Sequence, residues 1–228
     1  MGKGKNNEEL FRSMPVAQAI LTLAVPTVVS QIITIIYNMA DTFFIGQLGD
    51  PKQVAAATLA MPLFMFMTAL SNLFGVGGAS LISRFLGGGE REKASRCGAF
   101  CIWTAAAVSV LYGLMVLAGR PVLLPVLGAN EETCDMASSY LFWTIGLGAL
   151  PTVMNPALAH LIRSEGYSRQ ASLGVAFGGI LNMVLDPLFI YGLHLQITGA
   201  AVATLISNIT EMFYFLAFIR KIRSVSVL

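Results

Sequence analysis

Two acidic residues, Asp41 and Asp186, each lie in a long apolar stretch in which no other residue carries a formal charge. A carboxylate inside a membrane-spanning segment costs about 2.5 to 3.5 kcal/mol on insertion scales, so such residues usually face the interior of a helix bundle. There they mark pathways for ions or substrates. The two acids therefore favour chemistry in which a carboxylate gains and loses a proton or binds a sodium ion.

The depth of these acids in a membrane follows from their distance to the ends of the apolar stretches. Asp41 and Asp186 lie about four and five residues before an outer end, and Thr204 lies about five residues after one, so at about 1.5 Å per residue they are nearly level. Asn182 precedes Asp186 by one helical turn, and Tyr37 precedes Asp41 by the same spacing. We therefore expect these side chains to form one polar pocket.

The environment of this pocket indicates how it would work. Removing a carboxyl group from water, or placing two of them close together, favours the protonated form. Neighbouring hydroxyl and amide groups can donate hydrogen bonds to the carboxylates or, in part, coordinate a cation. The ordinary alternative is a buried hydrogen-bond cluster that only fixes the register of the helices.

Three other residues are candidates for a role in transport, and the sequence allows two interpretations of each. Glu211 follows Thr204 by seven residues, on roughly the same helix face, and either lines a substrate path or points to the cytoplasmic interface. Asn155 lies between Pro151 and Pro156 in mid-membrane, a broken-helix signature, and either lines a cavity or packs in the bundle. Pro26 interrupts a helix and acts either structurally or as a hinge.

The composition places the chain in a membrane, because 56% of its 228 residues are hydrophobic and only 11% are charged. A span needs about 20 residues to cross the hydrocarbon core. Six stretches are long enough, and they predict an all-α, polytopic membrane protein. They are residues 16–44, 54–85, 99–118, 136–162, 171–191 and 199–219.

The distribution of basic residues predicts the orientation, since such residues are retained on the cytoplasmic side of short loops. Most of the 14 Lys and Arg residues fall on one side, and only Lys52 and Arg120 fall on the other. Both termini are therefore expected in the cytoplasm, with residues 1–13 as a tail, 14–223 as the six-span lobe and 224–228 as the start of a linker. The cytoplasmic set is Lys3, Lys5, Arg12, Arg84, Arg91, Lys93, Arg96, Arg163, Arg169, Arg220, Lys221 and Arg223.

Other kinds of chemistry find little support. The glycine-rich loop at Gly87 lacks the preceding strand and the following Gly-Lys-Ser or Gly-Lys-Thr of a phosphate-binding loop. His160 and His194 lie near span ends, where histidine is common. The net charge of +2 is a topology signal and does not indicate a nucleic-acid partner. We expect no catalytic residue, no cofactor, and no metal beyond Na+ at the cation pocket.

Four motifs in order resemble the amino-terminal half of multidrug and toxic compound extrusion (MATE) transporters. They are the run from Tyr37 to Gly49, the run from Val54 to Pro62, the loop from Gly88 to Arg96, and the run from Leu181 to Gly192. The resemblance implies one six-helix lobe of a secondary antiporter in the cell inner membrane. Such antiporters expel organic, often cationic drugs and other xenobiotics in exchange for H+ or Na+.

The resemblance also implies roles for individual residues. In similar prokaryotic members, the acid of the first helix, the Asn and Asp of the fifth and a Thr of the sixth bind the coupling cation. These correspond to Asp41, Asn182, Asp186 and Thr204. A proline of the first helix is associated with bending during the transport cycle, and Pro26 corresponds to it.

The chain departs from that family in length, because the family has twelve spans in two similar lobes and the sequence ends after the sixth. The expected partners are a small organic substrate, membrane lipid, and either a missing carboxy-terminal lobe or a second copy of the chain. A lipid-linked oligosaccharide flippase of the same superfamily is one alternative. It would place cationic residues inside the spans to hold a diphosphate, whereas the sequence assigns the basic residues to loops. A non-transporting structural subunit is the other alternative.

Overall fold

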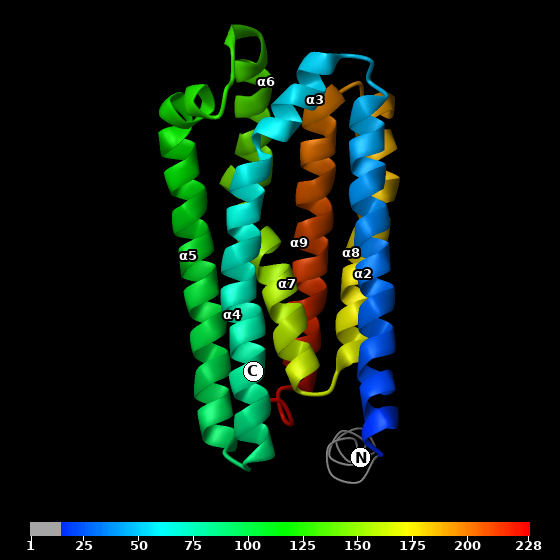
Figure 1. The fold of residues 1–228 in the computed structure, drawn as a ribbon, viewed down its shortest axis with the longest axis vertical. Coiled ribbons are helices and arrows are strands. Elements are labelled where there is room, and N and C mark those ends of the chain that lie inside the picture. The colour runs from blue at the N-terminus through cyan, green and yellow to red at the C-terminus, as the bar shows by residue number, and fades with distance from the viewer. Residues whose placement is uncertain (1–14) are drawn as a thin grey trace.

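The computed structural model describes residues 15–228, which form a bundle of helices and contain no strand within that range (Figure 1). The predicted tail, residues 1–13, lies outside the described residues. The helices are α2 (Val16–Gly46), α3 (Pro51–Leu59), α4 (Met61–Gly87), α5 (Arg91–Val126), α6 (Glu131–Leu141), α7 (Ala149–Ser164), α8 (Ser168–Pro187) and α9 (Gln196–Ile222), with two π-helical segments, η1 (Phe142–Leu147) and η2 (Leu188–Gly192).

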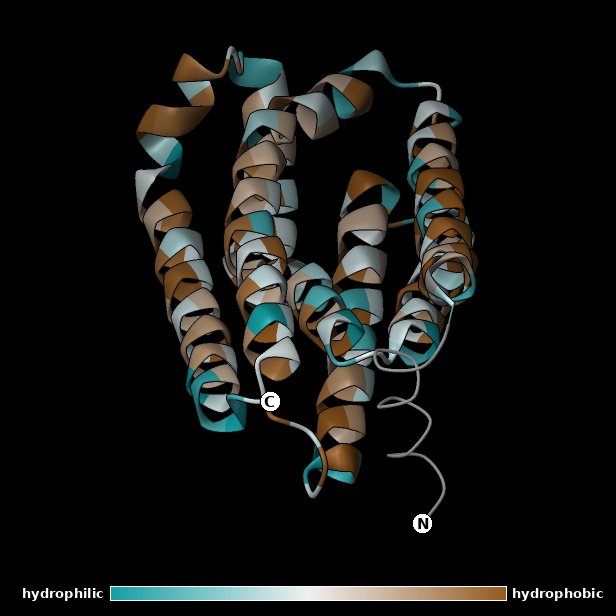
Figure 2. Cartoon of the chain, turned by 60° about the horizontal axis from the view of Figure 1, so that its bottom comes forward, coloured by the Kyte–Doolittle hydropathy of each residue, from teal (hydrophilic) through white to brown (hydrophobic). Residues whose placement is uncertain are grey.

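Five helical segments are long and apolar enough to span a bilayer, and a bent pair of helices makes a sixth span. The prediction of an all-α, six-span membrane protein is therefore confirmed. The start of α2 and the carboxy terminus lie at the same end of the bundle (Figure 1). Hydrophobic residues run along the outer faces of the helices, as a bilayer requires (Figure 2).

The helices α7 and α9 are central, because α7 packs on α4, α5, α8 and α9, while α9 also packs on α8. The first helix is peripheral: its main neighbour is α8, and only 6% of its most apolar window is buried. Figure 1 shows α2 and α4 on separate sides of the bundle, with α7 and α9 behind them. This arrangement determines where the polar cavity described below can lie.

The fourth span is broken, as its prolines suggested. The break falls where η1 ends at Gly148, just before Pro151 in the first turn of α7, and the two parts of the span meet at an angle of 49°. Beyond it, α7 continues as a helix through Pro156. The π-helical turns of η1 widen the helix before the bend, and Thr144 and Ile145 within it are buried by neighbouring helices.

The second predicted span is also divided, into α3 and α4. Pro62 lies in the first turn of α4, directly after the break between the two helices. A proline is favoured there because its missing N–H has no partner in the first turn of any helix. The preceding helix α3 runs across the end of the bundle opposite the carboxy terminus, and Asp50 caps it by accepting a hydrogen bond from the Lys52 amide (3.0 Å).

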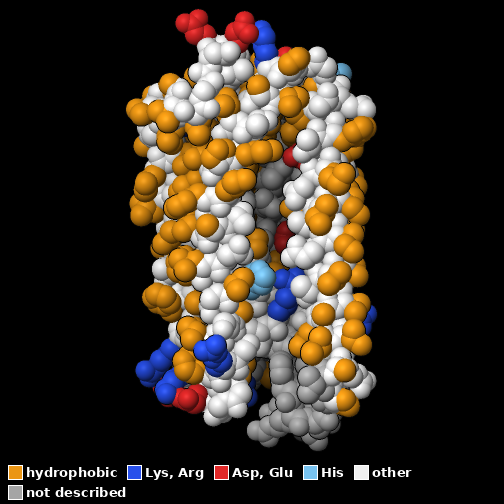
Figure 3. Space-filling view, in the orientation of Figure 1, with side chains coloured by type: hydrophobic (Ala, Val, Ile, Leu, Met, Phe, Trp, Pro, Cys, Tyr) orange, Lys and Arg blue, Asp and Glu red, His pale blue; other side chains and the backbone are white. Residues whose placement is uncertain are grey.

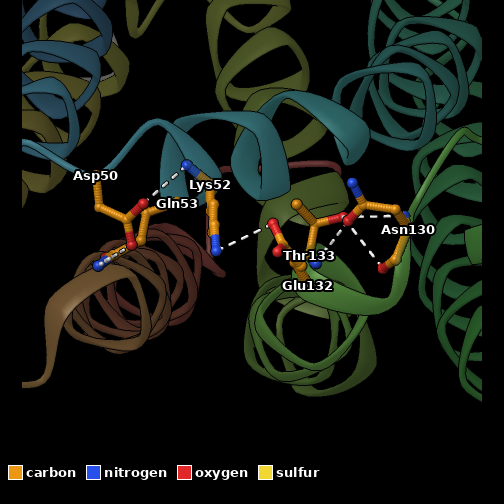
Figure 4. Close-up of polar contacts among 6 residues, drawn as sticks. All are labelled: Asp50, Lys52, Gln53, Asn130, Glu132 and Thr133. Carbon is orange, nitrogen blue, oxygen red and sulfur yellow. Dashed lines mark hydrogen bonds and ion pairs between the residues drawn. The ribbon is translucent and has the colours of Figure 1, made fainter.

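Side chains of α3 tie this end of the bundle together (Figure 4). Lys52 pairs with Glu132 of α6 at 3.0 Å, and a reciprocal cap between Asn130 and Thr133 fixes the start of α6. The buried Gln53 reaches the start of α9, where its amide nitrogen donates to Gln196 Oε1 and its oxygen accepts from the backbone N–H of Ile197, both at 3.0 Å. Gln53 is therefore the main polar link between α3 and α9.

Replacing Gln53 by Ala is expected to lower the free energy of unfolding by about 1 to 3 kcal/mol, because the buried N–H of Ile197 loses its acceptor. The melting temperature of the purified chain in detergent measures this. The exposed Gln47, at the end of α2, provides a matched control whose replacement by Ala should change little. Equal melting temperatures for the two variants would contradict the proposed link.

Close approach of helices depends on glycines at the crossing points. At Gly75 of α4, an added Cβ would lie 2.8 Å from the Cα of Ala157 in α7. At Gly174 of α8, it would lie 2.4 Å from the buried ring of Phe215 in α9. Small residues at these two crossing points therefore let the helices approach closely.

The last residues of the chain fold back onto the bundle. Glu165, in the turn after α7, accepts hydrogen bonds from the Ser226 hydroxyl (2.8 Å) and the Val227 amide (2.9 Å). Val227 is buried in a cluster with Ile82 of α4, and Leu228 packs against Gly98 of α5. The segment predicted as the start of a linker, residues 224–228, therefore packs against this end of the lobe.

Candidate functional site

A cavity of about 740 Å³ lies between α2 and α4, with α7, α8 and α9 forming its back wall. Figure 3 shows it as a hollow in which acidic, basic and histidine side chains are visible, in contrast to the apolar surface on either side. Its volume is within the range of about 300 to 1,000 Å³ that is typical of sites for drug-sized molecules. Every predicted site residue lines it except Pro26 and Asp186, and its polar lining includes Gln31, Thr34, Tyr37, Asn38, Asp41, Thr68, Ser71, Asn72, Thr152, Asn155, His160, Arg163, Asn182, Thr204, Ser207, Asn208 and Glu211.

Asn182 connects the predicted cation residues of α8 and α9. Its side-chain nitrogen donates to Asp186 Oδ1 at 3.2 Å and to Thr204 Oγ1 at 3.4 Å. The one-turn spacing of Asn182 and Asp186 on α8 makes the first contact, and the matching depth of Thr204 on α9 makes the second. The structure therefore brings together the polar groups that depth and spacing had placed level.

Asp186 is fully buried, with an exposed fraction of 0%, directly behind the wall of the cavity. Its second oxygen, Oδ2, has no hydrogen-bonding partner among residues 15–228. An unpartnered carboxylate oxygen in such a place is costly, so a proton or a cation on this atom would stabilise the site.

Asp41 approaches the same place from α2. Its Oδ1 is also buried without a partner in the described part of the chain, and Asp41 and Asp186 are close enough for their charges to repel each other. Tyr37, one turn earlier on α2, packs its ring against Gly179 of α8, where an added Cβ would lie 2.7 Å from Tyr37 Cδ1. The glycine thus lets α2 bring both residues against α8.

The other predicted cavity residues, Asn155 and Glu211, lie on α7 and α9. Asn155 donates from Nδ2 to the backbone oxygen of Asn208 at 2.9 Å, which links α7 to α9, and its Oδ1 is buried without a partner within residues 15–228. Glu211 is 8% exposed, and its carboxylate packs against Gly178. Glu211 therefore lines the cavity, and its place on a substrate path stays a prediction.

The sequence analysis did not assign two of the cavity residues, Arg163 and His160, to the candidate site. Arg163 was placed in a cytoplasmic loop and His160 at a span end, whereas both line the cavity on α7. The helical spacing of the α7 residues could have revealed both, because all the cavity residues of α7 lie on one face of the helix. They are Thr152, Asn155, Pro156, Ala159, His160 and Arg163.

Unpartnered polar atoms are concentrated at this cavity. Six buried side-chain polar atoms lack a hydrogen-bonding partner within residues 15–228, and four of them belong to residues of the lining. These four are on Asp41, Ser71, Asn155 and Arg163. Buried polar groups in folded proteins normally have partners, so water or a polar ligand in the cavity would satisfy these atoms.

Pro26 lies inside α2, which runs without interruption from Val16 to Gly46. The helix is therefore unbroken at Pro26 in this structure, and the role of Pro26 as a hinge remains a prediction. No group of three or more His, Cys, Asp or Glu side chains suited to a metal occurs in the part of the chain that the structure describes.

Comparison with known proteins supports this picture. A family model described as MatE matches residues 26–188. The multidrug export protein MepA of Staphylococcus saprophyticus subsp. saprophyticus is 32% identical over 212 residues, which are 92% of this chain and 47% of that protein. The chain thus spans about half the length of the curated relatives it matches.

Solved structures of transporters resemble this chain over nearly the whole bundle. An outward-facing multidrug resistance MATE family transporter of the MOP superfamily superposes with a TM-score of 0.88 at 30% identity, over 96% of this chain and 48% of that one. A MATE protein crystallised in a straight conformation gives a TM-score of 0.89, also at 30% identity, over 96% of this chain and 48% of the other. By the family model, the curated relatives and the fold of one lobe, the chain belongs to the MatE family of membrane transporters.

Proposed function

We propose that the chain is one lobe of a secondary antiporter that exports organic, often cationic compounds in exchange for H+ or Na+. The observation that carries this proposal is the pair of buried carboxylates, Asp41 and Asp186, whose unpartnered oxygens adjoin a cavity of about 740 Å³. A purely structural hydrogen-bond cluster would leave fewer of its acceptors unpartnered. The curated relatives are multidrug export proteins, which supports transport over an enzymatic activity.

The residues of the pocket fit a coupling ion of either kind. A proton can bind to either carboxylate, and a Na+ ion would find hard oxygen ligands on Asp41, Asp186 and the Thr204 hydroxyl. Asn182 already donates to Asp186 and Thr204, so its nitrogen holds both groups in place while its own oxygen is available as a ligand. These four residues are therefore the proposed cation site.

The exchange follows from the positions of the cation site and the cavity. Asp41 belongs to both, so a cationic compound in the cavity and a coupling ion at the site compete for the same negative charge. Binding of one favours release of the other, which is the thermodynamic requirement for antiport. Pro26 is proposed as the hinge through which α2 moves Asp41 relative to α8.

The lobe forms only part of the transport path. One wall of the cavity between α2 and α4 is open in this bundle (Figure 3), and we propose that a second lobe, or a second copy of the chain, completes it. The proposed orientation places both termini in the cytoplasm. The same end of the bundle carries the turns after α4 and α7.

Cation binding is expected to stabilise the purified chain, because a ligand that binds only the folded form raises its apparent stability by mass action. At a cation concentration of 100 times the dissociation constant, the gain is about 2.7 kcal/mol. The measurement is the melting temperature in detergent, with NaCl compared with choline chloride at equal ionic strength and over a range of pH. A melting temperature that responds to neither Na+ nor pH would contradict the proposed site.

The flippase alternative needs one correction. The sequence assigned all basic residues to loops, yet Arg163 lies within α7 and lines the cavity. One arginine beside the acidic Glu211 is a poor site for a diphosphate, since its net charge is about neutral. Drug export therefore remains the better proposal, and Arg163 needs a different explanation.

A further inference from the structure

Opposite charges face the inner part of the cavity. Arg163 of α7 and Glu211 of α9 both line it, and their charges attract each other through space. His160, one turn before Arg163 on the same face of α7, lies beside them. None of these three residues belongs to the proposed cation site.

Arg163 and Glu211 do not form a contact ion pair. The ion pairs within residues 15–228 join Lys52 to Glu132, Lys93 to Glu90 and Arg96 to Glu92. Arg163 instead donates from a terminal nitrogen to the Ser30 hydroxyl of α2 at 3.3 Å, and its Nε is buried without a partner in the described chain.

Glu211 packs against α8. Its carboxylate lies against Gly178 of α8, where an added Cβ would be 2.3 Å from Glu211 Oε2. Among residues 15–228 this carboxylate is in no hydrogen bond or ion pair of the structure. Arg163 thus contacts α2 and Glu211 contacts α8, and both side chains line the cavity.

This separation is informative because opposite charges next to protein attract more strongly than they do in bulk water. A structural ion pair would be expected to close, since each charge left without a direct partner bears a desolvation cost. A ligand with one group of each sign would satisfy both residues at once. Arg is especially suited to the anionic group, because its planar guanidinium binds carboxylates with defined geometry.

We propose that the inner part of the cavity binds zwitterionic organic compounds, with the ligand carboxylate paired to Arg163 and its cationic group paired to Glu211. The proposal rests on the proposed function in one respect, that the cavity holds the exported compound. It goes further by naming the substrate class and the residues that select it.

The test compares two fluorescent dyes that differ in one charge. Rhodamine B carries a carboxylate and a delocalised cation at neutral pH, whereas its ethyl ester carries only the cation. Binding of each dye to the purified chain in detergent is followed by fluorescence anisotropy. Replacing Arg163 by Gln is expected to weaken rhodamine B binding about tenfold or more and to leave the ester almost unchanged, because only the acid uses the guanidinium.

Three further variants make the test specific. Arg163→Lys keeps the charge and should recover part of the affinity for rhodamine B. Glu211→Gln should weaken both dyes, since both carry the cation. Arg169→Gln removes an exposed arginine outside the cavity and should change neither dye. A thermal melting curve for each variant verifies that it is folded.

The outcomes separate this proposal from the proposed function. If Arg163→Gln, folded, weakens both dyes equally or neither, the zwitterion site is wrong, while ester binding and cation-dependent stabilisation would still support an export lobe. If wild-type chain binds the ester but rejects rhodamine B, the site is also wrong. If neither dye binds and no cation response is found, both proposals fail.

Discussion

Replacing Asp186 by Asn is expected to abolish the cation response of the purified chain and drug efflux by the assembled transporter. Asn has nearly the same shape, so the hydrogen bond from Asn182 to Oδ1 can persist. The charge proposed to bind H+ or Na+ is lost, and with it the proposed competition between the ion and the exported compound. In the absence of cations the variant should even be more stable than the wild type, because no buried charge is left unpaired.

Asp41→Asn is expected to abolish efflux in the same way. The exposed Asp135 of α6 supplies a matched control, and its replacement by Asn should leave melting temperature, cation response and efflux unchanged. The measurements are melting temperature with and without Na+ at several pH values, and loss of dye from loaded cells. A full cation response in both Asp41→Asn and Asp186→Asn would reduce the pair to a structural role.

Replacing Gly75 by Leu is expected to separate α4 from α7 and to prevent stable folding of the lobe. The first atom of the new side chain would lie 2.8 Å from the backbone Cα of Ala157, and a backbone atom in a packed helix cannot move aside alone. Overpacking of a core costs about 1 to 3 kcal/mol for small insertions and more when a backbone must shift. We expect a loss of about 3 kcal/mol or more for Leu at this crossing point.

Gly77, two residues later on the same helix, gives the control. An added Cβ at Gly77 has nothing within 4 Å, so Gly77→Leu should fold normally and gain slightly from the better helix propensity of Leu. Size-exclusion chromatography and melting temperature in detergent compare the two variants. Similar behaviour of Gly75→Leu and Gly77→Leu would show that α4 and α7 are not held at the distance described.

The similar depth of Asp41, Asp186 and Thr204 in the membrane could be deduced from the sequence, because a helix rises by a constant amount per residue and membrane spans have recognisable ends. The same counting could not show which residues face one another across helices. The contact between Asn182 and Thr204 depends on how α8 and α9 are rotated, and that rotation is set by packing at glycines such as Gly174.

One residue escaped sequence reasoning for a physical reason. Arg163 was read as a loop residue because arginines near span ends usually extend toward water, whereas here the side chain turns inward to Ser30 of α2. The break in the fourth span could be anticipated from its prolines, which are the strongest local helix breakers, and it lies just before Pro151. The π-helical form of η1 could not be anticipated, because it depends on packing against α5 and α9.

The broken fourth span has a consequence for how the lobe is made during synthesis. The arm α7 has 16 residues and is therefore about 24 Å long, and α6 is shorter, so neither arm crosses a bilayer core of about 30 Å alone. The bend between them is covered by α5, which is synthesised earlier, and by α9, which is synthesised later than either arm. The fourth span can therefore enter the membrane as a unit but reaches its final shape only after the sixth has been inserted, which makes folding of the lobe a late, cooperative event in its biogenesis.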